Sequence, residues 1–192
     1  MSTIALFHSV LGVRTGVLQT ADLLRGDGHQ VVIVDQYGGK VFDDYEEAGL
    51  YVDTIGYPAL MQSALEAVAE LADGFIAAGY SNGGGMAQWV ALNRPVAGVA
   101  MLSGALPLEM LGVEGWPATV PAQIHYSATD PFLNREWLER AVTSIRNSGA
   151  SLETFLDYSG GHLFTDPTLP DEYNPTSAGL LFERLRAFCA SH

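Results

Sequence analysis

Six short apolar segments, separated by helical patterns, are the feature that most constrains what this chain can fold into. Several are near-continuous apolar runs, as expected for parallel strands that helices cover on both faces. The last alternates between apolar and polar residues, which is typical of an edge strand. Strands that alternate with helices imply right-handed crossovers and a mostly parallel sheet in a three-layer α/β/α fold. The predicted strands are Ile4–Phe7, Val31–Val34, Phe75–Ala78, Val99–Leu102, Gln123–Tyr126 and Leu152–Leu156.

The gaps between these strands carry apolar residues at helical spacing, which predicts helices there. Two further segments, Tyr37–Gly56 and Gly160–Asn174, are rich in acidic residues or proline, and we expect them to be irregular loops. Both follow predicted strands, at the edge where such sheets build their sites. The helical patterns cover Val17–Leu24, Leu60–Leu71, Gly84–Leu92, Leu138–Ile145 and a stretch that begins with Asn174-Pro175.

Length and composition suit one domain, residues 1–192, with a large apolar core. Hydrophobic residues make up 48% of the chain and charged residues 16%, and no repeat or linker divides it. The net charge of −13, with Lys40 as the single lysine, argues against nucleic acid or an anionic membrane as a partner. The start of the chain resembles no signal peptide, so we expect a cytoplasmic protein. A single cysteine, Cys189, excludes an internal disulfide framework and a cysteine-rich metal site.

The segment Gly79-Tyr80-Ser81-Asn82-Gly83 matches the pattern G-x-S-x-G, and its context makes the match informative. A predicted strand precedes it and a predicted helix follows, which is the strand–turn–helix setting of a nucleophile elbow. A nucleophile on such a strained turn needs neighbours without side chains, so that its hydroxyl stands exposed above the sheet. The pattern therefore predicts Ser81 as a nucleophile.

A serine hydroxyl is a weak nucleophile at neutral pH and needs an adjacent base. We favour His162 over a plain surface role because it follows the last predicted strand, in a loop that can reach across the sheet. The base in turn needs an acid on Nδ1. Asp130 directly follows the fifth strand and is preferred over Asp157, which closes the sixth. The resulting chain order, Ser81, Asp130, His162, is the one that accompanies a nucleophile elbow.

Acyl transfer also needs two N–H donors for the oxyanion that develops on the substrate. One is predicted to be the amide of Asn82, the residue after the nucleophile. The other is expected from the turn after the first strand, with Val10 preferred and Ser9 as the alternative.

These motifs resemble those of the dienelactone hydrolase family of α/β-hydrolases, over nearly the whole chain. The resemblance implies a minimal α/β-hydrolase fold with about six mostly parallel strands and no cap domain. It also implies a Ser-His-Asp triad, an acyl-enzyme intermediate, a small ester or lactone as the bound molecule, and no metal or organic cofactor. The matching segments are Phe7-His8-Ser9-Val10-Leu11-Gly12-Val13, Gly79-Tyr80-Ser81-Asn82-Gly83-Gly84, Ala128-Thr129-Asp130 and Gly161-His162-Leu163-Phe164.

The chain departs from the family pattern at three places. Ser81 stands where the best-known members have cysteine, and Ser9 matches the position of a glutamate that activates that cysteine. The stretch Leu163-Phe164-Thr165-Asp166 contains no arginine that could bind a substrate carboxylate. We therefore expect a neutral ester or lactone rather than dienelactone, and we expect Arg14 to be solvated.

Because the chain is short, we expect a shallow pocket that only the two irregular loops cover. Two other functions remain open: a thioesterase or acyltransferase on the same triad, and a hydrolase-fold binding protein without turnover. A homodimer is also left open. The predicted pocket walls include His8, Ser9, Leu11, Tyr37, Tyr80, Trp116 and Phe164.

Overall fold

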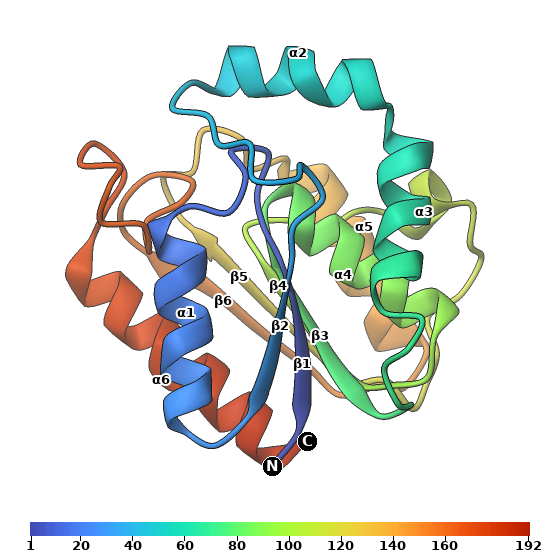
Figure 1. The fold of residues 1–192 in the computed structure, drawn as a ribbon. Coiled ribbons are helices and arrows are strands. Elements are labelled where there is room, and N and C mark those ends of the chain that lie inside the picture. The colour runs from blue at the N-terminus through green and yellow to red at the C-terminus, as the bar shows by residue number, and fades with distance from the viewer.

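The computed structural model describes residues 1–192, and a six-stranded sheet forms its centre (Figure 1). All neighbouring strands are parallel, in the order β2-β1-β3-β4-β5-β6. Every predicted strand is present, and the last one lies at an edge as expected. The strands are β1 (Thr3–Phe7), β2 (Gln30–Val34), β3 (Phe75–Tyr80), β4 (Val96–Leu102), β5 (Ala122–Ser127) and β6 (Leu152–Tyr158).

Helices cover both faces of this sheet, which confirms the three-layer α/β/α fold. Helices α1 and α6 lie on one face, and α3, α4 and α5 lie on the other (Figure 1). A single hydrophobic core of 49 buried residues joins the layers. No helix is long and apolar enough to cross a bilayer. The helices are α1 (Thr15–Gly26), α2 (Tyr45–Ile55), α3 (Tyr57–Ala67), α4 (Asn82–Asn93), α5 (Arg135–Asn147) and α6 (Pro175–Ser191), with a 3₁₀ turn η1 (Leu108–Leu111).

Helix α2 corrects the expectation that the segment between β2 and α3 is an irregular loop. Asp44 caps this helix, because its carboxylate accepts a hydrogen bond from the N–H of Glu47 at 2.8 Å. Glu46 and Glu47 occupy the first turn, where negative charge stabilises a helix. The acidic residues that suggested a solvated loop are thus the N-terminal signal of a helix. The other segment, Gly160–Asn174, forms only turns and bends, as predicted.

The direction of the chain connections reverses between β1 and β3. From β1 the chain crosses to β2 at one edge, whereas all later connections lead toward β6 at the other edge. Parallel sheets form a crevice at such a switch point, at the carboxyl ends of the strands. This end carries α2, and both chain termini lie at the opposite end (Figure 1).

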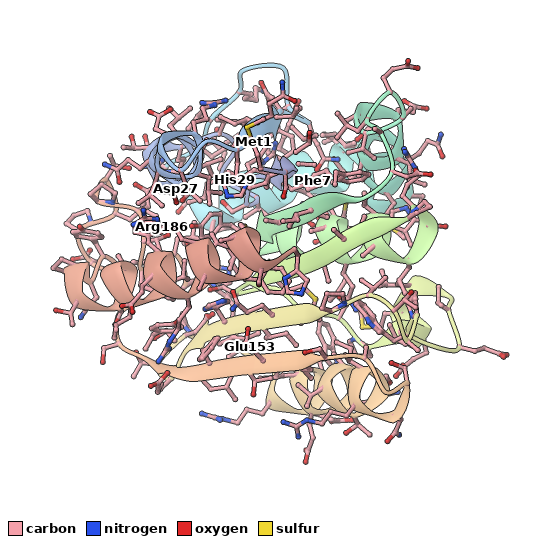
Figure 2. All side chains as sticks on the ribbon, turned by 90° about the horizontal axis from the view of Figure 1, so that it is seen from below. Met1, Phe7, Asp27, His29, Glu153 and Arg186 are labelled. Atoms are coloured by element: carbon pink, nitrogen blue, oxygen red, sulfur yellow. The ribbon has the colours of Figure 1, made fainter.

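The opposite end is closed by contacts between helices and the N-terminus. Figure 2 looks onto this end, where Arg186 of α6 donates to the carboxylate of Asp27, just after α1, at 2.6 Å. His29 lies here too and accepts from the N–H of Ser2 at 3.3 Å. His29 is therefore at the far end of the sheet from the elbow.

Candidate active site

Ser81 lies on a sharp turn between β3 and α4. Its backbone has φ 54° and ψ −118°, a conformation that is rare for residues other than glycine. The turn closes tightly, since a Cβ on Gly79 would lie 2.0 Å from the carbonyl oxygen of Gly83. A Cβ on Gly83 would in turn lie 2.4 Å from the carbonyl oxygen of His8. Both flanking glycines are therefore required by backbone contacts, as the elbow motif predicts.

The structure brings Ser81, His162 and Asp130 together in a hydrogen-bonded chain. Nε2 of His162 lies 2.6 Å from Oγ of Ser81, and Nδ1 lies 2.7 Å from Oδ2 of Asp130. The Asp130 carboxylate is fully buried, and its other oxygen accepts from the N–H of Phe132 at 2.8 Å. Asp157, the alternative acid, is exposed and pairs with Arg184 instead. The arrangement can hold the histidine with Nδ1–H toward the acid and Nε2 toward the serine.

Aromatic rings pack against the edge of this histidine. The centroids of Phe132 and Tyr45 lie 4.9 and 6.0 Å from that of His162, both at steep interplanar angles. The Tyr45 hydroxyl donates to the Glu172 carboxylate at 2.9 Å. Burial, together with the charge of Glu172, raises the pKa of Tyr45 well above its usual value. The hydroxyl therefore stays protonated and keeps this hydrogen bond at any physiological pH.

Glu172 also fixes the loop that carries His162. Its carboxylate accepts from the N–H of Leu163 at 2.6 Å, and its carbonyl accepts from the N–H of Gly161 at 2.9 Å. On the other side, the Ser103 hydroxyl donates to the carbonyl of His162 at 2.9 Å. The histidine is thus held by its backbone as well as by its ring.

Two backbone N–H groups are available beside Ser81 for an oxyanion. The N–H of Val10 makes no hydrogen bond within the protein. Asn82 is the first residue of α4, so its N–H has no acceptor one turn earlier in the helix. Val10, Asn82 and Ser81 line the same pocket. The turn that presents Val10 is held by Ser9, whose carbonyl accepts from the N–H of Gly12 at 3.1 Å.

This pocket has a volume of about 590 Å³ and opens over the triad. Of its twenty lining residues, twelve are hydrophobic. Helices α2 and α3 contribute walls to it, which corrects the expectation that only loops cover the site. The walls missed by sequence reasoning include Tyr45, Gly49, Tyr57, Met61, Met86, Ser103, Leu106, Tyr126, Phe132, Asn134 and Trp137. The sequence carries no signal for these walls, because the exposure of Tyr57, Phe132 and Trp137 beside the cavity is visible only in the folded structure.

None of the predicted wall residues lines this pocket, because each of these side chains is buried against other parts of the protein. His8 and Tyr37 pack on each other, with ring centroids 4.5 Å apart. Tyr80 directly precedes Ser81, and successive side chains along a strand point to opposite faces of the sheet. The Tyr80 side chain therefore points away from the pocket, and its hydroxyl lies 2.8 Å from that of Thr20. Trp116 donates to the carbonyl of Val120 at 2.8 Å. Ser9, Leu11 and Phe164 are likewise buried outside the pocket.

Arg14 is buried rather than solvated, which corrects our expectation. Its guanidinium donates to the Asp43 carboxylate and the Phe42 carbonyl, both at 2.6 Å, and lies 3.4 Å from the buried carboxylate of Asp166. It also donates to the Thr168 hydroxyl at 3.0 Å. Arg14 therefore ties the oxyanion turn to the loops on both sides.

His125 is a packed core residue. Its ring bonds to the Tyr158 hydroxyl and to Oε1 of Gln123, each at 2.8 Å. Burial lowers the pKa of His125 to about 3. No three His, Cys, Asp or Glu side chains come together in a way that could hold a metal ion.

The parallel sheet, the elbow after β3 and the histidine loop after β6 together define an α/β-hydrolase. The model of the dienelactone hydrolase family matches residues 1–192, so the chain belongs to that family. No sequence among curated proteins matches the chain.

Solved structures share the fold. One is a dienelactone hydrolase-like promiscuous phosphotriesterase, P91, from metagenomic libraries, with TM-score 0.80, 18% identity, and coverage of 100% of this chain and 86% of its own. A candidate dienelactone hydrolase from Klebsiella pneumoniae subsp. pneumoniae has TM-score 0.77 and 15% identity, covering 100% of this chain and 88% of its own. The Bacillus cereus carboxylesterase has TM-score 0.62 and 16% identity, covering 99% of this chain and 88% of its own. At these identities the likeness establishes the fold, and family and fold together are those of hydrolases.

Proposed function

We propose that this protein is a serine hydrolase that cleaves small carboxylic esters or lactones through an acyl-enzyme on Ser81. The observation that carries the proposal is the continuous chain from Ser81 through His162 to the buried Asp130, with distances of 2.6 and 2.7 Å. Side chains this close argue against a binding protein that has lost turnover. The names of solved neighbours, a carboxylesterase and an esterase, support the same reaction class.

Each group has a defined role in the proposed reaction. Oγ of Ser81 attacks the ester carbonyl carbon while Nε2 of His162 takes its proton. Asp130 stabilises the resulting imidazolium and keeps the ring oriented. The N–H groups of Val10 and Asn82 hold the negative oxygen of the tetrahedral intermediate. His162 then protonates the leaving alcohol oxygen, and water releases the acyl group by the same steps in reverse.

A fluorophosphonate probe tests the proposal directly, because it phosphonylates an activated serine. We expect intact-mass analysis to find one adduct on Ser81 in the folded protein, and none in Ser81→Ala. The variant should also lose at least about 10³-fold in kcat/KM on p-nitrophenyl acetate.

Ser103→Ala is a matched control, since Ser103 lines the same pocket and has a similar φ of 55°. Because the Ser103 hydroxyl also holds the carbonyl of His162, we expect this variant to be labelled more slowly than the wild type but still to completion. Labelling that persists in Ser81→Ala, or no labelling of folded wild-type protein, contradicts the proposed role of Ser81.

A further inference from the structure

The lining of the active-site pocket contains no aspartate, glutamate, lysine or arginine. From this, we propose that the enzyme selects uncharged monoesters that place an alkyl or aryl group of medium length in the pocket, and rejects esters that carry a second, ionised group. The inference rests on the proposed function and names the substrate class of that site. A volume of about 590 Å³ is in the range of sites that enclose most of a drug-sized ligand.

The polar groups of the lining are largely engaged within the protein. Outside the triad, four of them already have partners: Tyr45 donates to Glu172, Tyr126 accepts from the N–H of Ala105, Ser103 donates to the His162 carbonyl, and Asn134 accepts from the N–H of Trp137. The Tyr57 hydroxyl and Nδ2 of Asn134 donate no hydrogen bond within the protein, and Nδ2 of Asn82 is buried. These donors are neutral and suit an ester oxygen, whereas a desolvated carboxylate needs several converging donors or a cation. Beyond the ester group, the lining therefore offers apolar surface and neutral donors, but no charge that could hold an ionised group.

No cation lines the pocket, and two arginines near it are paired with carboxylates. Arg135, the chain neighbour of the lining residue Asn134, forms no ion pair but is exposed to solvent outside the lining. Arg14 forms ion pairs with Asp43 and Asp166 and does not line the pocket. Arg140 forms an ion pair with Glu109, the chain neighbour of the lining residue Met110. The only lysine, Lys40, lies over the ring of Tyr51, outside the pocket lining. A buried substrate carboxylate would thus lose its hydration without a compensating charge.

The mouth of the pocket is apolar and exposed. Met110 and Phe132 are 52% and 56% exposed, and Tyr57 and Trp137 are 51% and 39% exposed. These four side chains come from α3, η1, the loop after β5 and α5, yet all line one pocket. Exposed apolar groups that converge on a cavity indicate a surface that a ligand covers. An alkyl or aryl group that enters the pocket would cover them.

Chain-length dependence is the first arm of the test. We expect kcat/KM for p-nitrophenyl acetate, butyrate, hexanoate and octanoate to rise about fourfold for each buried methylene until the pocket is full. A parallel series of alkyl acetates places the chain on the alcohol side, and a rise in either series supports the inference. A rate that falls from the shortest to the longest chain in both series overturns it.

Charge discrimination is the second arm. The p-nitrophenyl monoester of adipic acid has a neutral isostere, p-nitrophenyl 6-methylheptanoate, in which an isopropyl group replaces the carboxylate. We expect the neutral ester to exceed the anionic one at least tenfold in kcat/KM, with Ser81→Ala giving the background rate. Equal turnover of the two esters overturns the inference.

Met110→Lys adds a cation at the exposed mouth of the pocket. It should lower the ratio of kcat/KM for the neutral ester to kcat/KM for the anionic ester at least threefold. The matched variant Met110→Gln is polar but neutral and should leave the ratio unchanged. If Gln narrows the ratio as much as Lys, general polarity rather than charge decides selection, and the inference is overturned. No Ser81-dependent turnover of any ester would instead contradict the proposed function, so the two failures are distinguishable.

Discussion

Ser81 and Ser103 are the two residues other than glycine with positive φ, and both line the candidate active-site pocket. Such a backbone costs about 1–3 kcal/mol for each residue and persists only where the surroundings hold it. Here the N–H of Ser81 donates to the carbonyl of Leu102, and the N–H of Ser103 donates to that of His125, both at 2.7 Å. Strain in this molecule is therefore confined to the site and held by bonds to neighbouring strands.

His125 predicts how stability depends on pH. Its pKa in the folded protein is about 3, compared with about 6.5 in an unfolded chain. Between these values the unfolded state binds a proton that the folded state does not, so the free energy of unfolding falls as pH falls. From pH 7 to pH 5 we expect His125 to contribute a loss on the order of 2 kcal/mol. Urea unfolding at the two pH values measures it.

His125→Gln is the control for this effect, since it removes the titrating group and keeps polar atoms near Gln123 and Tyr158. The variant should be less stable overall. Its free energy of unfolding should fall by about 2 kcal/mol less than that of the wild type between pH 7 and pH 5. An identical pH dependence in both proteins would show that the buried imidazole is not the cause.

At the scale of elements, α4 depends on glycines that let it approach the chain after β4. A Cβ on Gly84 would lie 2.3 Å from the carbonyl oxygen of Gly104. A Cβ on Gly104 would in turn lie 1.9 Å from the carbonyl oxygen of Ser81. We expect Gly84→Ala to lower the free energy of unfolding by about 2 kcal/mol and, by moving the elbow, to lower kcat at least tenfold. Denaturant unfolding and ester kinetics measure the two effects.

Gly179→Ala is the matched substitution, because Gly179 is also inside a helix but has no atom within 4 Å of its Cβ position. It should raise stability by about 0.5–1 kcal/mol and leave kcat unchanged. If the two alanine variants behave alike, close approach of α4 is not what the Gly84 position requires.

The sequence predicts elements and triad far better than it predicts the pocket. Buried parallel strands are apolar runs, and each triad residue directly follows a strand, so chain order alone places them at one edge of the sheet. Helix α2 was missed because its first-turn acids, Glu46 and Glu47, resemble a solvated loop. The pocket walls were missed because they depend on side-chain direction. His8 and Phe132 both lie near the site in the chain, but only Phe132 points into the cavity.

At the scale of the whole molecule, the net charge of −13 surrounds a pocket that itself has no ionised lining. Helix α2 contributes pocket walls and also carries the exposed acids Glu46 and Glu47. The surface acids therefore act on a substrate while it approaches, through the electrostatic field of the protein. The uncharged lining acts after the substrate has entered, because the substrate loses its hydration there. Salt affects the first contribution and hardly affects the second.

This separation predicts a salt effect for charged esters alone. The Debye length falls from about 30 Å at about 0.01 M to about 3 Å at about 1 M ionic strength, so salt should weaken the repulsion between protein and anionic ester. We expect kcat/KM for the p-nitrophenyl monoester of adipic acid to rise severalfold over this range, relative to its neutral isostere. The isostere corrects for general effects of salt on the enzyme. A ratio that stays constant would mean that desolvation in the pocket, without the surface field, accounts for all rejection of anions.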